Sequence, residues 1–394
     1  MCCRLFRHSW KHGLVEVSVM NICIITPRYP TSLDPTAMPF VQQLAWALTD
    51  LGNTCTVICP QNFSKKLNRE YTEKTPRGGD VKVYLPSTLH LGQQTVLGFN
   101  TAVPTTYFFW KAARKVMKKL PKQDVVYGHF ITPSGITAAR LHREFGVPAF
   151  LGYGESSSWS IEHYGADRVR KELFEDLAGV VAVSSKNAEV LQQFAVVPQE
   201  KVEIFPNGFD DSIFNPRDKK KAREKLGFPQ DDFIVSFVGH FIERKGLNVL
   251  IPAVEKAGVR MICAGKGSID PRGENCLFAD TIGHEDLPWF YSASDVFVLP
   301  TLNEGCCNAI VEALACGLPI VSSDLPFNYD ILDETNSILV DPTDVAALAA
   351  SICKLRDDPA LRQKLSEGSL NKAKTLTLQQ RAKNIQQFFA DRSK

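Results

Sequence analysis

The segment with the clearest potential for chemistry is residues 295–317, DVFVLPTLNEGCCNAIVEALACG. An apolar strand is predicted to end before a loop containing Glu304 and Gly305, and a helix is predicted to begin near Asn308. The free N–H groups and the positive dipole end of such a helix form a binding site for a phosphate. Glu304 would lie beside that phosphate. Glu312 would lie about one turn inside the helix, where it could accept hydrogen bonds from a ribose. The alternative is a plain loop carboxylate and a solvated helix residue, and spacing alone does not decide between the two.

A second segment, FVGHFIERKG at residues 237–246, has the same strand-to-helix character. The strand is predicted to end at Gly239, and the polar loop after it supplies His240, Arg244 and Lys245. Cations on such a loop can neutralise a diphosphate leaving group. An ordinary charged loop is the competing interpretation.

The elements around both segments alternate between short β-branched runs and helical patterns, which is typical of parallel α/β sheets. The polar segment PNGFDDSIFNPRDKKK, which begins at Pro206, interrupts this series before it resumes. We therefore predict an α/β protein with two doubly wound, Rossmann-like domains, at residues 20–205 and 206–375, and a C-terminal helix at 376–394 that returns to the first domain. Ligands bind at the carboxyl ends of parallel strands, so the site is expected in the cleft between the domains.

Composition favours a globular protein without a membrane span. The chain has 394 residues, 44% hydrophobic and 22% charged, and no run of eighteen apolar residues. Its 11 cysteines lack the paired spacings of a zinc site, which favours a reducing, cytoplasmic location and no bound metal. Residues 1–19 precede the first strand-like run, MNICIITPRYP, and are interpreted either as an extension from a misplaced start or as an ordered appendage.

Charge is unevenly divided along the chain. Residues 1–199 have a net charge of +7 and residues 200–394 a net charge of −5. The N-terminal half is therefore expected to face something anionic, whereas the overall pI of about 7.9 gives no reason to expect nucleic-acid binding.

Taken together, these segments resemble the family-four retaining glycosyltransferases from about residue 20 to the C-terminus. The family's E-x7-E pattern is matched by Glu304 and Glu312, within EGxxNxxxEALACGLPIV. Its G-R-x4-K-G loop is matched by Gly239, Lys245 and Gly246, but the usual arginine is His240. The segments VEIFPNGFDDSIFNP, AGKGS and VAVSSKNAEVLQQF also look like family segments.

The resemblance implies a GT-B fold and a nucleoside diphosphate sugar as donor, with no metal or other cofactor. It places Lys245 and His240 at the diphosphate, Glu304 at the sugar hydroxyls and Glu312 at the ribose. Arg244 is an alternative source of the missing guanidinium. The predicted donor site also includes Gly239, Arg244, Gly265, Lys266, Gly305, Cys306, Cys307 and Asn308.

The N-terminal half departs further from the family. LDPTAMPFVQQ stands where many members have a glycine pair, and Tyr153 and Gly154 stand where many have a His-Gly pair at the transferred sugar. Tyr153 can still donate a hydrogen bond. Glu155 is either an acceptor-side base or ligand or a structural residue, and His129 either faces the cleft or is a core histidine.

Residues 107–122, YFFWKAARKVMKKLPK, contain six Lys or Arg residues and no acid. A basic helix with aromatic residues at one end could lie on an anionic membrane, at the inner face of the cytoplasmic membrane, or hold a polyprenyl diphosphate acceptor. A solvated helix with its aromatic end in the core is the alternative.

These observations predict retaining sugar transfer to a glycan or lipid-linked acceptor in bacterial cell-envelope polysaccharide synthesis, such as that of lipopolysaccharide. Two other interpretations remain open at this point. One is a GT-B-fold epimerase that acts on the nucleotide sugar itself, and the other is a non-catalytic GT-B partner subunit.

Overall fold

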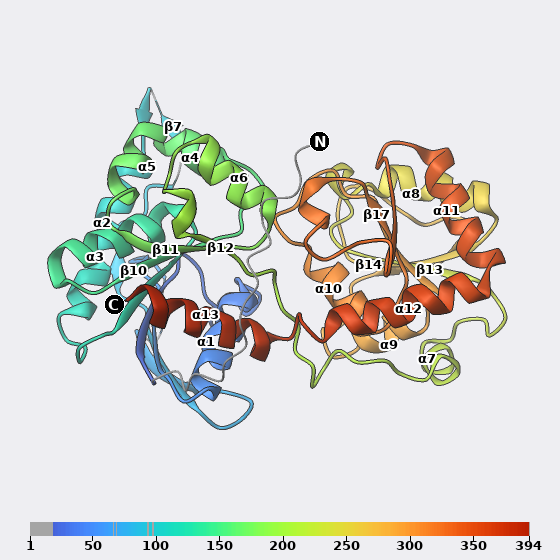
Figure 1. Cartoon of the computed structure of the whole chain (residues 1–394), viewed down its shortest axis with the longest axis horizontal. Helices are drawn as coiled ribbons and strands as arrows, with labels where there is room; N and C mark the ends of the chain where they lie inside the picture. The colour runs from blue at the N-terminus through green and yellow to red at the C-terminus, as the bar shows by residue number, and fades with distance from the viewer. Residues whose placement is uncertain (1–18, 66, 68, 93, 97, 394) are drawn as a thin grey trace.

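The computed structural model describes residues 19–65, 67, 69–92, 94–96 and 98–393. Two α/β domains lie side by side along the long axis of the molecule (Figure 1). The predicted extension at residues 1–19 lies outside the described residues except for Val19, so its nature stays a prediction. Within the described part of the chain, no helix is both long and apolar enough to cross a membrane.

The N-terminal domain is built on an eight-stranded sheet with the order β12-β11-β10-β9-β1-β2-β5-β4, parallel except for β4 against β5. Its central strands are buried, β9 and β10 at all five residues and β1 at four of five, because helices cover both faces. The strands are β1 (Asn21–Ile25), β2 (Thr54–Ile58), β4 (Glu70–Lys74), β5 (Asp80–Tyr84), β9 (Val125–His129), β10 (Ala149–Tyr153), β11 (Leu177–Ala182) and β12 (Val202–Ile204). The helices are α1 (Pro39–Asp50), α2 (Ala102–Met117), α3 (Ile136–Phe145), α4 (Trp159–Tyr164), α5 (Ala166–Leu173) and α6 (Ser185–Gln193).

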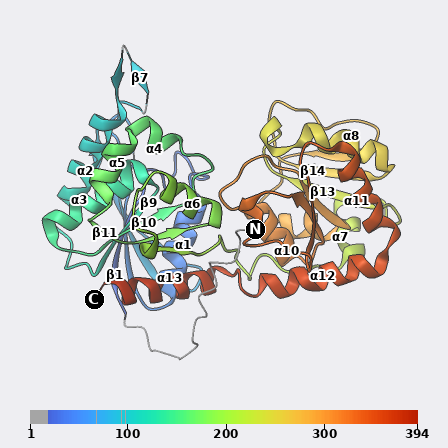
Figure 2. The same cartoon turned by 45° about the horizontal axis from the view of Figure 1, so that its top comes forward.

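Two small strand pairs decorate this domain. Strands β3 (Gln61–Asn62) and β6 (Ser87–Thr88) pair in parallel, and β7 (Thr95–Val96) and β8 (Phe99–Asn100) form a hairpin. The hairpin projects from the body of the domain (Figure 2).

The C-terminal domain has a six-stranded parallel sheet with the order β15-β14-β13-β16-β17-β18. In both sheets the strand order reverses direction beside the first strand of the domain, which is the doubly wound topology that the sequence predicts. The strands are β13 (Ile234–Val238), β14 (Arg260–Ala264), β15 (Cys276–Asp280), β16 (Val296–Leu299), β17 (Ile320–Ser323) and β18 (Ser337–Val340). The helices are α7 (Lys219–Leu226), α8 (Leu247–Ala257), α9 (Leu287–Ser292), α10 (Asn308–Ala315), α11 (Val345–Asp357) and α12 (Pro359–Ala373).

The last helix, α13 (Leu378–Arg392), leaves the C-terminal domain and runs along the N-terminal one (Figure 1). Its apolar face joins the N-terminal core through Ile385, Phe388 and Phe389, which are all buried. Arg381 on the same helix is buried and donates a hydrogen bond to the carbonyl of Pro206 at 2.9 Å, so the helix also holds the start of the linker. The predicted return of the C-terminal helix to the first domain is confirmed.

Candidate active site

The loop after β16 and the start of α10 form the centre of the site. The helix begins at Asn308, where the sequence predicts it, and its N-cap residue Cys307 makes no side-chain capping bond. The positive end of α10 is therefore left for an external anion. Glu304 lies in the preceding loop and is only 9% exposed.

Three donors converge on a single oxygen of Glu304. Its Oε1 atom lies 2.6 Å from Nζ of Lys245 and 3.0 Å from Nη1 of Arg244, and it accepts a hydrogen bond from the hydroxyl of Thr301 at 3.0 Å. Breaking such a largely buried cluster by removing one partner is costly, because a charge is left without compensation. The cluster links the two segments that sequence analysis singled out.

Lys245 is held in place by the turn that follows it. Gly246 has φ +74°, and a side chain there would place its Cβ 2.0 Å from the carbonyl oxygen of Pro300, so only glycine lets the cationic loop lie against the end of β16. Burial acts to lower the pKa of Lys245, but the electrostatic influence of Cys307 and of the Glu304 carboxylate, together with the hydrogen bond to Glu304, outweighs it. The pKa of Lys245 therefore lies above its ordinary value, and the side chain stays cationic.

Glu312 lies on the cavity wall one turn into α10 and accepts a hydrogen bond from the hydroxyl of Tyr291 at 2.9 Å. Burial raises the pKa of Glu312 to about 7, against a smaller lowering by the Tyr291 hydrogen bond. The carboxyl is therefore close to the midpoint of its titration at neutral pH. Glu304 and Glu312 thus occupy different environments, the first paired with cations and the second with a neutral phenol.

These groups open onto a cavity of about 700 Å³ between the two domains. The C-terminal domain contributes the residues predicted to contact the diphosphate, the sugar hydroxyls and the ribose, and the N-terminal domain faces them with residues that include Gly154, Glu155 and His129. The predicted residues that line it are His129, Glu155, Gly239, His240, Arg244, Lys245, Glu304, Gly305, Cys306, Cys307, Asn308 and Glu312. The structure therefore has a cavity between the domains, which is where the sequence predicts the site.

Three predicted residues lie elsewhere. The Tyr153 side chain is buried in the N-terminal core, with its hydroxyl unpartnered, and only its neighbours Gly154 and Glu155 reach the cavity. Gly265 and Lys266 support the cationic loop instead of lining the cavity. A Cβ at Gly265 would lie 1.9 Å from the carbonyl oxygen of Gly239, and the carbonyl of Lys266 accepts a hydrogen bond from the amide of Phe241 at 2.9 Å.

His129 closes the cavity on the N-terminal side as a neutral base. Burial and the nearby charge of Arg381 lower the pKa of His129 to about 3. Its Nδ1 atom is buried without a partner, and its ring lies 5.4 Å from that of Phe40, which also lines the cavity. Nδ1 lies against β10, 3.2 Å from where a Cβ on Gly152 would be, so a hydrogen bond to a ligand would have to use Nε2 of the neutral ring.

Glu155 is more deeply engaged with the protein than an exposed base would be. Its carboxylate accepts hydrogen bonds from the hydroxyl of Ser160 and from the amide of Ile131. Burial raises the pKa of Glu155 despite these bonds. Its backbone and the next two residues, Ser156 and Ser157, line the cavity.

Sequence analysis missed several cavity residues because no local pattern marks them. Phe40 begins its segment as an ordinary apolar helix residue, and Asn207 lies in the linker. Asn207 donates from Nδ2 to Oδ1 of Asn308 at 2.8 Å and to the carbonyl of Cys306 at 3.2 Å, which ties the linker to the start of α10. Its place in the family-like segment PNGFDD was the available signal.

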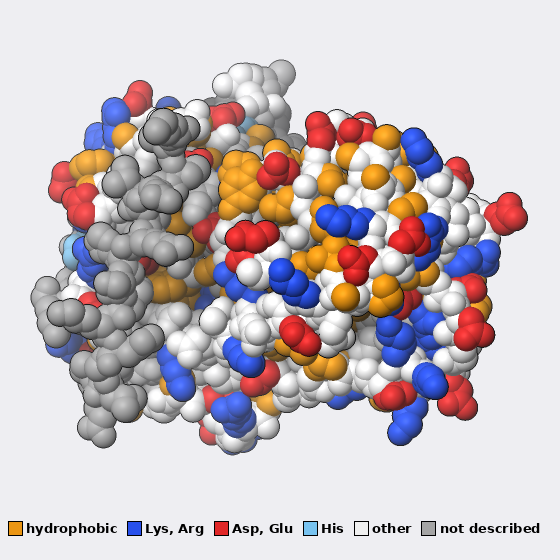
Figure 3. All heavy atoms as spheres, turned by 45° about the vertical axis from the view of Figure 1, so that its right-hand side comes forward, with side chains coloured by type: hydrophobic (Ala, Val, Ile, Leu, Met, Phe, Trp, Pro, Cys, Tyr) orange, Lys and Arg blue, Asp and Glu red, His pale blue; other side chains and the backbone are white. Residues whose placement is uncertain are grey.

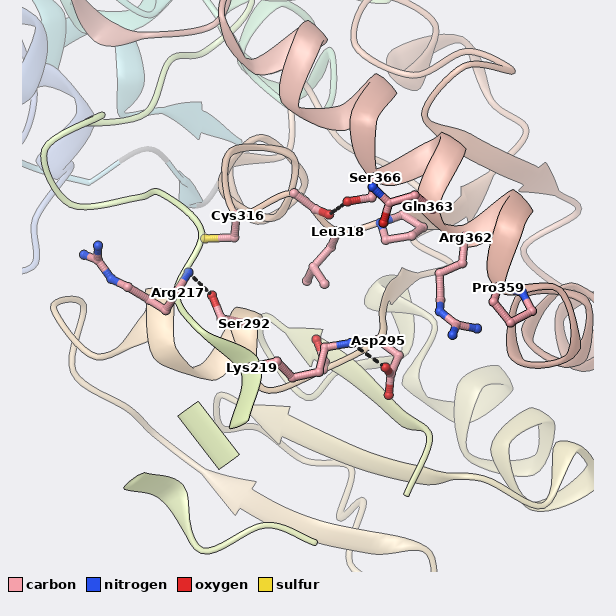
Figure 4. Close-up of a pocket in the computed structure, with 13 residues that line it drawn as sticks. Arg217, Lys219, Ser292, Asp295, Cys316, Leu318, Pro359, Arg362, Gln363 and Ser366 are labelled. Carbon is pink, nitrogen blue, oxygen red and sulfur yellow. Dashed lines mark hydrogen bonds and ion pairs between the residues drawn. The ribbon is translucent and has the colours of Figure 1, made fainter. Parts of the chain in front are cut away.

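A second cavity, of about 360 Å³, lies at the end of the C-terminal sheet where the strands β16 and β17 begin (Figure 4). Three cations, Arg217, Lys219 and Arg362, line it. Lys219 is paired with Asp295 at 2.7 Å, whereas Nε of Arg217 is buried without a partner. The cavity lies just before the two strands begin, so it does not share the ligand-binding position of the first.

One face of the C-terminal domain carries charges of both signs. On the face drawn in Figure 3, acidic and basic side chains are interspersed. The attraction for an anion is therefore concentrated at the cavity, where Arg244, Lys245 and the end of α10 converge.

Gly305 marks a close approach of the two domains. A Cβ at this position would lie 2.6 Å from the carbonyl oxygen of Gly154. Gly305→Ala is therefore expected to hold the domains apart and to lower any activity that needs them closed by about tenfold or more, with little loss of stability. Melting temperature and turnover would be compared with those of Gly273→Ala, since a Cβ at Gly273 meets no atom within 4 Å. Equal turnover in the two variants would contradict the close approach.

The two facing doubly wound sheets, the interdomain cavity and the returning helix define the class of GT-B-fold glycosyltransferases. Two family models match the chain: "Glycosyltransferase Family 4" over residues 39–213 and "Glycosyl transferases group 1" over residues 218–372. The chain belongs to the family-four glycosyltransferases.

Named relatives agree with this assignment, and solved structures share the fold. The chain is 26% identical to the "Putative teichuronic acid biosynthesis glycosyltransferase TuaC" of Bacillus subtilis (strain 168), over 88% of this chain and 92% of that protein. It is 26% identical to a D-inositol 3-phosphate glycosyltransferase of Stackebrandtia nassauensis, over 97% and 92%. Sucrose-phosphate synthase from Thermosynechococcus elongatus superposes with a TM-score of 0.75 at 21% identity, over 94% and 98%. Anabaena HepE, in complex with UDP and glucose, superposes with 0.67 at 16%, over 93% and 98%.

Proposed function

We propose that the protein transfers a sugar from a nucleoside diphosphate sugar to a glycan or lipid-linked acceptor, with retention of the anomeric configuration. The observation that carries the proposal is the arrangement of the cavity wall. Two cations, the positive end of α10, Glu304 and Glu312 all lie on this wall, and Glu304 pairs with both cations. A diphosphate fits the cationic region, and the carboxyls can hold the hydroxyls of the sugar and the ribose.

In this proposal the protein acts by positioning and by charge. Lys245, Arg244 and the N-H groups of α10 stabilise the negative charge that develops on the leaving diphosphate. Glu304 orients the sugar and supports the positive charge that develops on its ring. The leaving phosphate takes the acceptor's proton on the face from which it departs, so no protein nucleophile is needed. His129, a neutral base on the N-terminal wall of the cavity, holds the sugar from that side.

Two observations support an acceptor in envelope polysaccharide synthesis. The similarity to TuaC covers most of both chains, and the N-terminal half of this chain carries a net charge of +7, which suits an anionic acceptor. The reaction needs no metal ion in this proposal, because the cationic loop supplies the positive charge at the diphosphate.

A thermal-shift screen of nucleotide sugars, followed by transfer assays with the stabilising donor, tests the function. We expect one donor to raise the melting temperature and to release its nucleotide only when a glycan or lipid-linked acceptor is present. NMR of the product should give the same anomeric configuration as the donor. Conversion of the donor without an acceptor would identify an epimerase instead, and stabilisation without any chemistry would identify a non-catalytic subunit.

Helix α2 supports membrane contact as part of this function. Phe109 is buried in the core, so the aromatic end of the helix is partly structural, but Lys115, Lys118 and Lys119 are exposed. Tyr107, in the second turn of the helix, is 44% exposed, and the projecting hairpin β7–β8 lies in the same domain (Figure 2). The helix therefore presents charge and an aromatic side chain together, as an interfacial segment does.

Changing Lys115, Lys118 and Lys119 to Glu is expected to weaken binding to anionic vesicles by at least tenfold, because each lysine near such a surface contributes about 1 kcal/mol. High salt should have the same effect on the wild type. Co-sedimentation with phosphatidylglycerol vesicles measures it, with Lys220, Lys221 and Lys256 of the C-terminal domain changed to Glu as the matched control. Equal binding by both triple variants would assign α2 to the solvated-helix interpretation.

A further inference from the structure

The N-terminal end of α6 contacts the C-terminal domain at two places. Ser185 donates from its amide and from its hydroxyl to the two carboxylate oxygens of Asp330, each at 2.6 Å. The next residue, Lys186, reaches the loop that carries Glu304. Both contacts join residues more than a hundred positions apart in the chain. Ser185, Lys186 and Asp330 lie outside the cavity wall, whereas Glu304 is part of it.

The ammonium group of Lys186 binds oxygens from both domains at once. It donates to the carbonyl of Ser156 in its own domain at 3.0 Å, to the carbonyl of Glu304 at 3.0 Å, and to Oδ1 of Asn303. It also lies 5.6 Å from the ring centre of Phe327. The group is half-buried, and burial lowers the pKa of Lys186. Because all three hydrogen-bond acceptors are uncharged, the contact orients the loop without neutralising the Glu304 carboxylate.

The same loop is held from the other side by the cationic segment. Arg244 donates from Nη1 to the carbonyl of Asn303 at 2.5 Å and to Oε1 of Glu304 at 3.0 Å. Residues 303 and 304 are therefore fixed between Lys186, which comes from the N-terminal domain, and Arg244, which comes from the C-terminal one. Only the second of these two supports persists when the domains move apart.

We infer that Lys186 is a positioning residue that fixes the Glu304 loop only when the two domains are closed, with the Ser185–Asp330 pair as the second half of the same latch. This inference rests on the proposed transferase function, because it assigns the loop a part in turnover. It makes domain closure and the alignment of Glu304 one event: an open molecule can bind a nucleotide on its C-terminal domain, but it lacks the support that orients the carboxylate toward the sugar.

A purely structural role for Lys186 would have a different signature. Loss of ordinary packing or of one hydrogen bond lowers the free energy of unfolding. It does not lower kcat selectively relative to nucleotide affinity. Loss of a closure-dependent support lowers kcat and leaves nucleotide binding, which uses the cationic loop and α10, nearly unchanged.

The test compares the full-length wild type with Lys186→Met, Lys186→Arg and Lys201→Met. Lys201 is a suitable control because it also donates to two backbone carbonyls, those of Phe174 at 3.2 Å and Glu175 at 3.4 Å, but both lie in its own domain. The measurements are UDP affinity by calorimetry, the radius of gyration with and without UDP by small-angle X-ray scattering, and kcat and donor KM.

For Lys186→Met we expect UDP affinity within about threefold of the wild type, a molecule that stays more open with UDP, and a kcat lower by about 10- to 100-fold. Lys186→Arg should recover part of kcat, and Lys201→Met should behave as the wild type. If Lys186→Met proves unstable, Asp330→Asn tests the other half of the latch with the same three measurements. A Lys186→Met protein that closes on UDP like the wild type, or that keeps its kcat, would overturn the inference. If the wild type turns over no donor, the proposed function fails, but the scattering data still decide whether Lys186 controls closure.

Discussion

Glu304→Gln is expected to lower kcat by on the order of 100-fold and to lower the free energy of unfolding of the empty protein by about 3 kcal/mol. Both effects have one cause. The carboxylate is the ion-pair partner of Lys245 at 2.6 Å and of Arg244 at 3.0 Å, and Lys245 is only 9% exposed. A glutamine keeps the shape and one acceptor oxygen, but it leaves two converging cations without a counter-charge.

The stability part of this prediction can be separated from the catalytic part. UDP would bring a diphosphate to the same cations, so we expect the gap in melting temperature between wild type and Glu304→Gln to narrow when UDP is added. The control is Asp286→Asn, which removes the partner of Lys225 in an ion pair whose side chains are both more than 40% exposed. That change should cost less than about 1 kcal/mol. Wild-type stability and turnover in Glu304→Gln would contradict the assignment of this carboxylate.

Sequence analysis predicted the parts of the site whose functional side chains lie within one short strand–loop–helix segment. The segment from Val296 to Ala315 is an apolar strand, a loop and a helix in direct succession, and the carboxylate and the helix end that it positions are both local features. The cationic loop at 239–246 has the same character. In such segments the hydrophobic period and the turn residues fix the geometry over a few residues, so the printed sequence is sufficient.

Tyr153 shows why other positions could not be predicted. All five residues of β10 are buried, so the strand has no alternation to indicate which side chains face the cavity. The family comparison supplied the position but not the direction of the side chain. Contacts between distant segments were equally inaccessible: Lys186 and its partner Asn303 are 117 positions apart, and no period or motif links them.

The environment of His129 also depends on a contact between segments that are distant in the sequence. The guanidinium that helps to keep it neutral, Arg381, lies on the helix that returns from the far end of the chain. Sequence analysis predicted that helix and its direction, but a helical pattern gives no register against a sheet in another domain. The electrostatics of the site therefore depend on packing that only the folded chain specifies.

Glu312 should make the stability of the empty protein depend on pH in a way that Glu312→Gln does not. The pKa of Glu312 rises from 4.5 to about 7 in the fold, so the folded state holds a proton that the unfolded chain has released between these values. Its contribution to stability is fully present below about pH 4.5 and is lost as pH rises through about 7. The difference in unfolding free energy between wild type and Glu312→Gln should therefore change by at most about 3 kcal/mol over this range. Urea unfolding at several pH values measures it, and a pH-independent difference would show that the carboxyl is solvated.

Nucleotide binding should reverse this proton uptake, because ribose hydroxyls donate hydrogen bonds and so favour the ionised form of the carboxyl. Near pH 6.5 we expect UDP binding to release a fraction of a proton from the wild type that Glu312→Gln does not release. Calorimetry in two buffers of different ionisation enthalpy gives that number directly, and subtracting the value for Glu312→Gln removes protons exchanged at the diphosphate. Tyr291→Phe refines the assignment. The hydrogen bond from the Tyr291 hydroxyl lowers the pKa of Glu312, so without it the proton release on binding should occur at higher pH. Identical proton release by wild type and Glu312→Gln would place the ribose away from Glu312, while leaving the cationic diphosphate site untouched.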